Sequence, residues 1–291
     1  MKRVFFALLT TLSVLALVQN PCYAEGAYLT TYGHPIDAGE LELMLMNDFT
    51  SPSGHKREEG QENYLSHMVE LEYAPTSQLA LEWMTEWFEE TGGDEAKFTG
   101  FRYEARYRLF EKDVPLNPVV YVEYEDLDPE TRYKMEVSGW IKPPYEEEET
   151  EEPSRERIVE TRIILSQDFL ERWNTAFNWI NESNTDDGVT AFGYTMGVSY
   201  ALTAGSEEGE RHHHDSGGHG AWIRPASVAL ELLGGVGDSK SLKIDPENQE
   251  HYLQPSIMVH VGERAMLSLG FAIGLTRSSD DLVRLNVGFE F

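Results

Sequence analysis

Apolar and polar residues alternate along most of the chain after residue 39. The stretch LVRLNVGFEF, residues 282–291, places apolar side chains at every second position from Val283 to Phe291, with Arg284 and Asn286 between them. Such alternation is typical of a β-strand with one apolar and one polar face. The same rhythm recurs over residues 39–49, 63–73, 79–87, 101–110, 119–125, 158–166, 173–182, 190–202, 227–233, 252–261 and 265–275.

These segments have the length that a tilted strand needs to cross a bilayer, although soluble β-sandwiches also alternate in this way. Connection lengths favour the membrane: short turns at Pro75 and Gly262 alternate with much longer connections. Aromatic residues also lie near strand ends on the apolar face, where they would meet the bilayer interface. We therefore expect an all-β fold, a transmembrane antiparallel up-and-down β-barrel of about twelve strands. Fourteen strands are the alternative, if residues 133–141 and another segment near Tyr28 also span.

The first 24 residues have the features of a secretory signal peptide. Lys2 and Arg3 precede a short apolar run, and small residues close the segment, so we expect cleavage after Ala24. Cleavage would remove Cys22, the only cysteine of the chain. We expect residues 25–38 to form an N-terminal periplasmic segment and residues 39–291 to form the barrel.

The charge of the chain limits its partners. It has 51 acidic and 23 basic residues, a formal net charge of −28, and a nucleic-acid-binding protein needs a basic surface instead. We expect outer-membrane lipid and the outer-membrane assembly machinery as partners, with Phe289 and Phe291 as the assembly signal. Small solutes remain open as further partners, and we expect the bacterial outer membrane as the location.

Charged residues occupy the polar face of several predicted strands, which would line the lumen. Such charges either set the selectivity of a water path or pair into a network that closes the barrel. The candidates for lining the lumen are Glu70, Glu72, Glu82, Glu86, Arg102, Glu104, Arg106, Arg108, Glu123, Glu160, Arg162 and Arg284.

Two inserts interrupt the alternation. An acidic insert at 126–157 is expected outside the cell, and a His-rich insert at 205–222 is expected in the periplasm. Imidazoles suit transition metals, but adjacent histidines in a Gly-rich segment impose no coordination geometry. A solvated loop and a weak divalent transition-metal site therefore stay open, and no other cofactor is expected. The candidate ligands are His212, His213, His214, Asp215 and His219.

The stretches ETRIILSQDF (160–169), TAFNWINES (175–183), FGYTMGVSYAL (192–202) and LSLGFAIGLTRSSDDLVRLNVGFEF (267–291) resemble a broad group of bacterial outer-membrane barrels. Many members of that group are labelled transporters, including ones placed with aromatic-degradation pathways. The resemblance implies a barrel over roughly residues 39–291 and offers no catalytic residues.

Three functions follow from these observations. We expect a narrow channel or transporter for small solutes, and the alternative is a closed barrel with a structural or surface-interaction role. A lipid hydrolase is a third hypothesis, because such a barrel enzyme carries a Ser/His pair on its lipid face and His67 falls on the apolar face of its strand. However, Thr85 is the nearest hydroxyl on the neighbouring strand and no serine shares that face, so we expect no enzyme.

Overall fold

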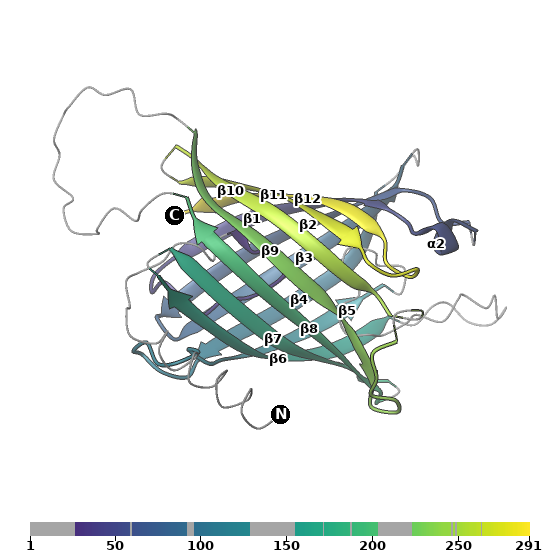
Figure 1. The fold of residues 1–291 in the computed structure, drawn as a ribbon, viewed down its shortest axis with the longest axis horizontal. Coiled ribbons are helices and arrows are strands. Elements are labelled where there is room, and N and C mark those ends of the chain that lie inside the picture. The colour runs from purple at the N-terminus through teal and green to yellow at the C-terminus, as the bar shows by residue number, and fades with distance from the viewer. Residues whose placement is uncertain are drawn as a thin grey trace, which may run out of the picture.

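Twelve antiparallel strands close into one barrel (Figure 1). The computed structural model describes residues 27–58, 60–91, 96–128, 155–170, 172–186, 188–202, 223–245, 247, 249–262 and 264–291. The predicted signal peptide thus lies outside the described residues. In the described part of the chain, no helix is both long enough and apolar enough to span a membrane. The strands are β1 (Leu41–Ser51), β2 (Tyr64–Thr76), β3 (Leu79–Glu90), β4 (Lys97–Arg108), β5 (Val119–Leu127), β6 (Glu156–Phe169), β7 (Trp173–Asn184), β8 (Thr190–Ala201), β9 (Ile223–Asp238), β10 (His251–Val261), β11 (Ala265–Gly274) and β12 (Asp281–Glu290), and one short helix, α2, spans Gly54–Glu58.

Each strand pairs with its neighbours in the chain, and β1 pairs with β12 to close the ring. The count of twelve confirms the expected barrel. Strand β5 pairs directly with β6, so the connection between them leaves and returns at the same rim. The fourteen-strand alternative therefore fails, because the closed ring has no position for residues 133–141, which themselves lie outside the described residues.

The two faces of the wall differ in chemistry. On β2, Ser66, Met68 and Glu70 are buried, whereas Leu71 and Tyr73 are 40% and 48% exposed. On the other strands, too, polar side chains point into the barrel and apolar side chains point outwards. An outer surface of large apolar side chains fits a hydrocarbon environment, in which the backbone of a closed barrel is fully paired.

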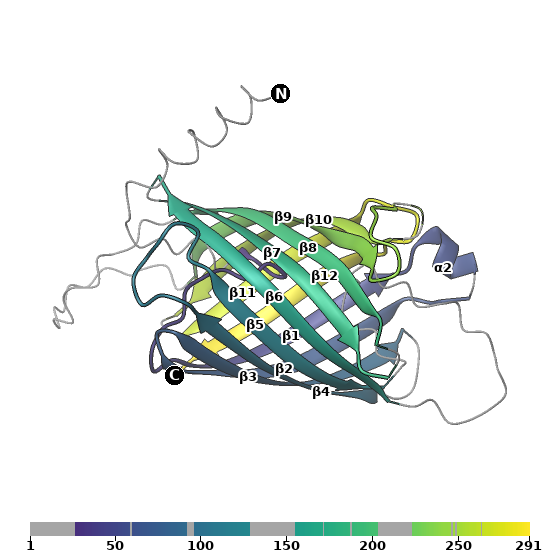
Figure 2. The same ribbon diagram turned by 90° about the horizontal axis from the view of Figure 1, so that it is seen from below.

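The connections lie at two rims. One rim carries Phe291 and the turns at 77–78, 170–172 and 262–264, and we call it the C-terminal rim. The opposite rim carries α2, and we call it the α2 rim (Figures 1 and 2). The strand ends that flank residues 203–222 lie at the C-terminal rim, and those that flank 129–154 lie at the α2 rim. Residues 203–222 and 129–154 themselves lie outside the described residues. The ends of the predicted acidic insert belong to the barrel instead, because Asp126 and Leu127 are part of β5 and Glu156 and Arg157 are part of β6.

Residues 27–36 run inside the barrel. The purple stretch that precedes β1 lies within the ring of strands in both ribbon views (Figures 1 and 2). Ala27, Thr31, His34 and Ile36 are buried. This placement corrects the expected periplasmic segment for these residues. These residues lie in the lumen because its wall supplies hydrogen-bond partners for their backbone and polar groups. We call residues 27–36 the inner segment.

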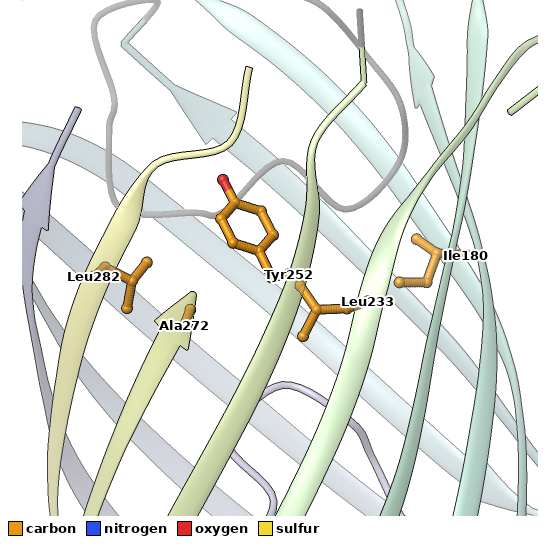
Figure 3. Packing of buried hydrophobic residues seen from close by; sticks show 5 residues of the cluster. All are labelled: Ile180, Leu233, Tyr252, Ala272 and Leu282. Atoms are coloured by element: carbon orange, nitrogen blue, oxygen red, sulfur yellow. The ribbon is translucent and has the colours of Figure 1, made fainter. Parts of the chain in front are cut away.

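Apolar patches interrupt the polar lining of the lumen. Figure 3 shows Ile180, Leu233, Tyr252, Ala272 and Leu282 side by side on strands β7 and β9 to β12. All are almost fully buried. Smaller apolar patches receive the inner segment: Ile36 packs with Ala74 and Ala80, and Ala27 packs with a patch on β9 and β10. The core of this barrel is therefore its filled lumen.

Candidate functional site

The strongest anchor of the inner segment is the carboxylate of Glu231, on β9. It accepts hydrogen bonds from three consecutive backbone N–H groups, those of Leu29, Thr30 and Thr31, over 2.9, 3.0 and 2.7 Å. The amide of Gln254 donates a fourth bond to it, over 2.9 Å. Glu231 has no exposed surface. A buried carboxylate is tolerated when donors surround it, and here the backbone of the inner segment supplies most of them.

Asn178, on β7, binds the backbone of the inner segment as a neighbouring strand would. Its Oδ1 accepts from the N–H of Tyr32 over 2.8 Å, and its Nδ2 donates to the carbonyl of Tyr32 over 2.9 Å. Four residues nearer the C-terminal rim on the same strand, Asn174 Oδ1 accepts a hydrogen bond from the Tyr28 hydroxyl over 3.0 Å. At the other end of the inner segment, His34 Nδ1 lies 2.5 Å from Ser166 Oγ. Two faces of the wall therefore fix the segment in one register.

Two lumen-facing glycines leave room for the segment. A Cβ at Gly197 would lie 2.5 Å from the ring of Tyr28, and a Cβ at Gly270 would lie 2.2 Å from Leu29 Cδ1. Both distances are shorter than any van der Waals contact. A side chain at either position would therefore have to displace the inner segment.

Arg284, on β12, joins the wall to the inner segment. Its guanidinium donates to both oxygens of Asp48 on β1, over 2.8 and 2.6 Å. It also donates to the carbonyl of Leu29 over 3.1 Å. Both partners of the ion pair are buried. This fork-to-fork geometry is the strongest form of an ion pair, and it lies across the strand pair that closes the barrel.

Arg102, on β4, forms the centre of a second buried network. Its guanidinium lies 3.3 Å from Glu86, 3.4 Å from Glu123 and 2.8 Å from Glu125. All four side chains are nearly inaccessible. One cation thus serves three carboxylates that come from the strands on both sides of it.

Arg106 lies nearer the C-terminal rim and forms a third network. It pairs with Glu72 over 2.5 Å, with Glu104 over 3.0 Å and with Glu82. Its guanidinium also lies 5.0 Å from the ring centre of Tyr32, and that of Arg162 lies 4.9 Å from the same ring. The Tyr32 ring is therefore a cation–π partner of two arginines, and its hydroxyl donates to Glu104.

The structure places all the predicted lumen candidates on the inward face of their strands. Most are buried, and Glu72 and Arg106 are partly buried. Arg162 pairs with Glu160 on its own strand, and Arg108 pairs with Asp113 in the connection after β4. They belong to several networks rather than one site.

Phe289 and Phe291 lie exposed at the C-terminal rim, and the predicted metal ligands lie outside the described residues.

Sequence reasoning missed the residues that hold the inner segment. They are Asn174, Asn178, Glu231 and Gln254. Each is a polar residue at an inward position of an alternating strand, so the sequence predicts that its side chain faces the lumen. Its partner was not, because nothing in the pattern of residues 27–36 indicates that they enter the lumen.

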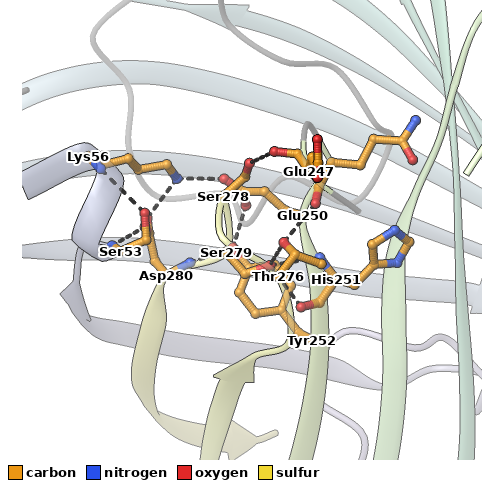
Figure 4. Close-up of polar contacts among 11 residues, drawn as sticks. Ser53, Lys56, Glu247, Glu250, His251, Tyr252, Thr276, Ser278, Ser279 and Asp280 are labelled. Carbon is orange, nitrogen blue, oxygen red and sulfur yellow. Dashed lines mark hydrogen bonds and ion pairs between the residues drawn. The ribbon is translucent and has the colours of Figure 1, made fainter. Parts of the chain in front are cut away.

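A polar network joins three connections at the α2 rim (Figure 4). Lys56 Nζ lies 2.5 Å from Glu250 and 3.0 Å from Asp280, and the N–H of Ser53 donates to Asp280 over 2.8 Å. Burial lowers the pKa of Lys56, but the two carboxylates outweigh that effect and raise it above its ordinary value. Lys56 therefore stays charged, and it ties the α2 connection across the mouth to the connections before β10 and β12.

His67 lies on the outward face, as its position in the alternation indicates. Its Nδ1 lies 2.8 Å from Oδ1 of Asn47, which is its Cα partner on β1. Among the described residues, this histidine thus pairs with an amide rather than with the hydroxyl that a hydrolase would need.

The architecture defines a closed twelve-strand barrel with an apolar outside and a charged, filled inside. No protein-family model matches the chain, and no curated protein matches it. Solved structures match its fold. The outer membrane channel from Pseudomonas putida F1 has 11% identity and a TM-score of 0.51, and the match covers 94% of this chain and 100% of that one.

Two further structures are more distant. The KdgM porin has 8% identity and a TM-score of 0.44, with 86% and 99% of the two chains covered. LpxR from Salmonella typhimurium has 10% identity and a TM-score of 0.45, with 87% and 100% covered. The chain has the fold of bacterial outer-membrane β-barrel channels, which confirms the fold that the sequence resemblance implied.

Proposed function

We propose that this protein is an outer-membrane channel that prefers small cationic or neutral solutes, and that the inner segment keeps its lumen closed. The observation that carries the proposal is the sign of the buried charge. Rings of Asp and Glu side chains favour cations in channels. Among the described strand residues, ten buried carboxylates face four buried arginines: Asp48, Glu70, Glu82, Glu86, Glu104, Glu123, Glu125, Glu160, Glu182 and Glu231 against Arg102, Arg108, Arg162 and Arg284.

The chemistry of the outer surface supports a place in the outer membrane. Exposed side chains such as Leu71, Val120 and Ile163 would be costly in water but suit lipid. Because barrels of this kind have short periplasmic turns, the C-terminal rim faces the periplasm and the α2 rim faces outwards. Export through the predicted signal peptide, cleaved after Ala24, completes this proposal.

The contacts of the inner segment support closure rather than a permanent block. The segment is held by hydrogen bonds and cation–π contacts to the wall, and it contributes no strand to the barrel. Its departure would leave the wall pairing intact and would open the space between the β6–β9 side and the β12–β3 side. The acidic lining would then meet the solute.

Ion selectivity in planar bilayers tests the proposal. The refolded full-length protein is reconstituted with KCl of unequal concentration on the two sides, and the reversal potential of single-channel currents is measured. We expect the sign that corresponds to cation preference. A reversal potential of the opposite sign would reject the role of the acidic lining, and protein-free detergent serves as the control.

A closed barrel with a structural or surface-interaction role is the second candidate. The filled lumen favours it, because most of the inward charges are paired and little of their surface is accessible. This candidate predicts that neither the wild type nor a variant with weakened anchors of the inner segment carries current. The same bilayer recordings therefore decide between the two.

A further inference from the structure

Glutamates outnumber arginines sharply around Arg106. Glu42, Glu70, Glu72, Glu82 and Glu104 are the nearest inward carboxylates of β1 to β4, and only three of them pair with Arg106. Glu42 and Glu70 are the two that do not, and Glu70 is the more deeply buried of them. It is only 7% exposed, and it makes no hydrogen bond or ion pair with the described residues.

The geometry of the cluster fits a bound cation. Glu70, Glu72 and Glu82 each present a carboxylate oxygen, and these three oxygens lie within 4.8 Å of one another. Calcium binds oxygens at roughly 2.3–2.6 Å, so ligands on opposite sides of one ion are up to about 5 Å apart. In addition, the buried Oε2 of Glu82 has no hydrogen-bond partner. Two side chains thus have coordination capacity that the protein does not use.

The neighbouring cluster around Arg102 shows the contrast. Glu123, Glu125 and Glu160 satisfy the same distance criterion. There, Arg102 reaches Glu123 and Glu125, and Arg162 reaches the third carboxylate, Glu160. In the Glu70 cluster Arg106 likewise reaches Glu72 and Glu82, but no arginine of the described residues pairs with the third carboxylate. The Glu70 cluster has no equivalent donor to Glu70. Its surplus charge must be neutralised by protons or by a cation, because isolated buried carboxylates are costly.

We propose that Glu70, Glu72 and Glu82 bind a divalent cation of the calcium class inside the lumen. Carboxylate oxygens are the donors that such hard cations prefer. The ion joins β2 to β3 and lies in the network of Arg106 and Glu104, to which Tyr32 of the inner segment donates a hydrogen bond. This site does not depend on whether the barrel conducts.

Calcium titration of the refolded full-length barrel by isothermal calorimetry tests the site. The chain is stripped with EDTA and compared with Glu70→Gln and, as a matched control from the other cluster, Glu123→Gln. Gel mobility of unheated samples confirms that each variant is folded. We expect the wild type to bind calcium, Glu70→Gln to weaken one binding step at least tenfold, and Glu123→Gln to retain it.

Thermal unfolding supplies a second readout, which responds only to calcium that binds the folded barrel more tightly than the unfolded chain. Calcium should raise the unfolding temperature of the wild type and of Glu123→Gln, but not that of Glu70→Gln. Equal shifts in all three proteins, or no calcium binding to the wild type, would overturn the site and leave protons as the neutralising species. A conduction failure in bilayers would leave both readouts unchanged, so the two proposals fail separately.

Discussion

Glu231 and Thr31 are 200 positions apart in the chain, yet the carboxylate of one accepts a hydrogen bond of 2.7 Å from the backbone N–H of the other. The bond joins β9 of the wall to the inner segment within the lumen. It belongs to a set of three that satisfies consecutive N–H groups of a segment without regular secondary structure. Such groups need partners when they are buried, which explains why the segment and the wall depend on each other.

We predict that Glu231→Ala lowers the free energy of unfolding by about 2–4 kcal/mol, because it leaves buried N–H groups without an acceptor. Glu231→Gln keeps an acceptor oxygen and should cost less. Urea titration followed by tryptophan fluorescence measures both, with the exposed Glu90→Gln as a control that should change stability by less than about 0.5 kcal/mol. Equal stability of Glu231→Ala and the wild type would contradict the anchoring role.

Arg284 and Asp48 should show strong energetic coupling, since they form a buried bidentate pair across the closing strands. Removal of one partner from a buried pair costs about 3–5 kcal/mol. We predict losses in that range for Arg284→Met and for Asp48→Asn. A double-mutant cycle should then give a loss for the double variant at least about 2 kcal/mol smaller than the two single losses combined. Additive losses would show that the two residues act independently.

Gly197→Ala should disturb the inner segment more than the wall, because the added methyl group meets the ring of Tyr28. Overpacking of this kind costs about 1–3 kcal/mol. We expect Tyr28→Ala to rescue much of this loss in the double variant Gly197→Ala/Tyr28→Ala. Gly54→Ala is the matched control, since a Cβ there meets no atom within 4 Å. Without rescue in the double variant, Tyr28 would not be the group that Gly197 accommodates.

The stability of the barrel should depend on pH through Glu40, which precedes β1 at the C-terminal rim. Burial, followed by the nearby carboxylates of Asp37 and Glu290, raises the pKa of Glu40 from 4.5 to about 7. The folded protein therefore holds this proton more tightly than the unfolded chain does. Its contribution is fully present below pH 4.5 and is lost as the pH rises to 7.

Glu40→Gln should flatten that part of the pH profile. Because Glu40 is partly exposed, solvent screening reduces the effect to about 1 kcal/mol. Unfolding free energies at several pH values between 5 and 8 measure the slope for the wild type and the variant. A slope that is identical in the two proteins would show that Glu40 titrates alike in the folded and unfolded states.

The strands were predictable because the period of two fixes the face of every side chain. Glu70, Arg102 and Arg284 face inwards as their alternation requires, and the strand count follows from the number of alternating runs. The partners of these residues were not predictable in the same way. The Asp48–Arg284 pair depends on the register between β1 and β12, which closure of the ring determines and which no local pattern encodes.

The inner segment shows the other limit of sequence reasoning. Residues 27–36 form no strand that pairs into the barrel, so neither alternation nor turn chemistry reveals their place. Their position results from long-range hydrogen bonds to Asn178, Glu231 and other inward side chains. Gly197 and Gly270 leave space for the segment at two inward positions of the wall. The sequence alone does not show what fills that space, so these glycines could be interpreted only with the structure.

Single-channel recording of one variant tests the central claim most directly, that the inner segment closes an acid-lined channel. Asn178→Ala/Glu231→Ala removes the hydrogen bonds to Leu29, Thr30, Thr31 and Tyr32 while it leaves the strand pairing unchanged. We predict rare openings in the wild type and an open probability at least tenfold higher in the folded variant, with cation preference in both. Equal open probabilities, or a folded variant that carries no current, would contradict the claim.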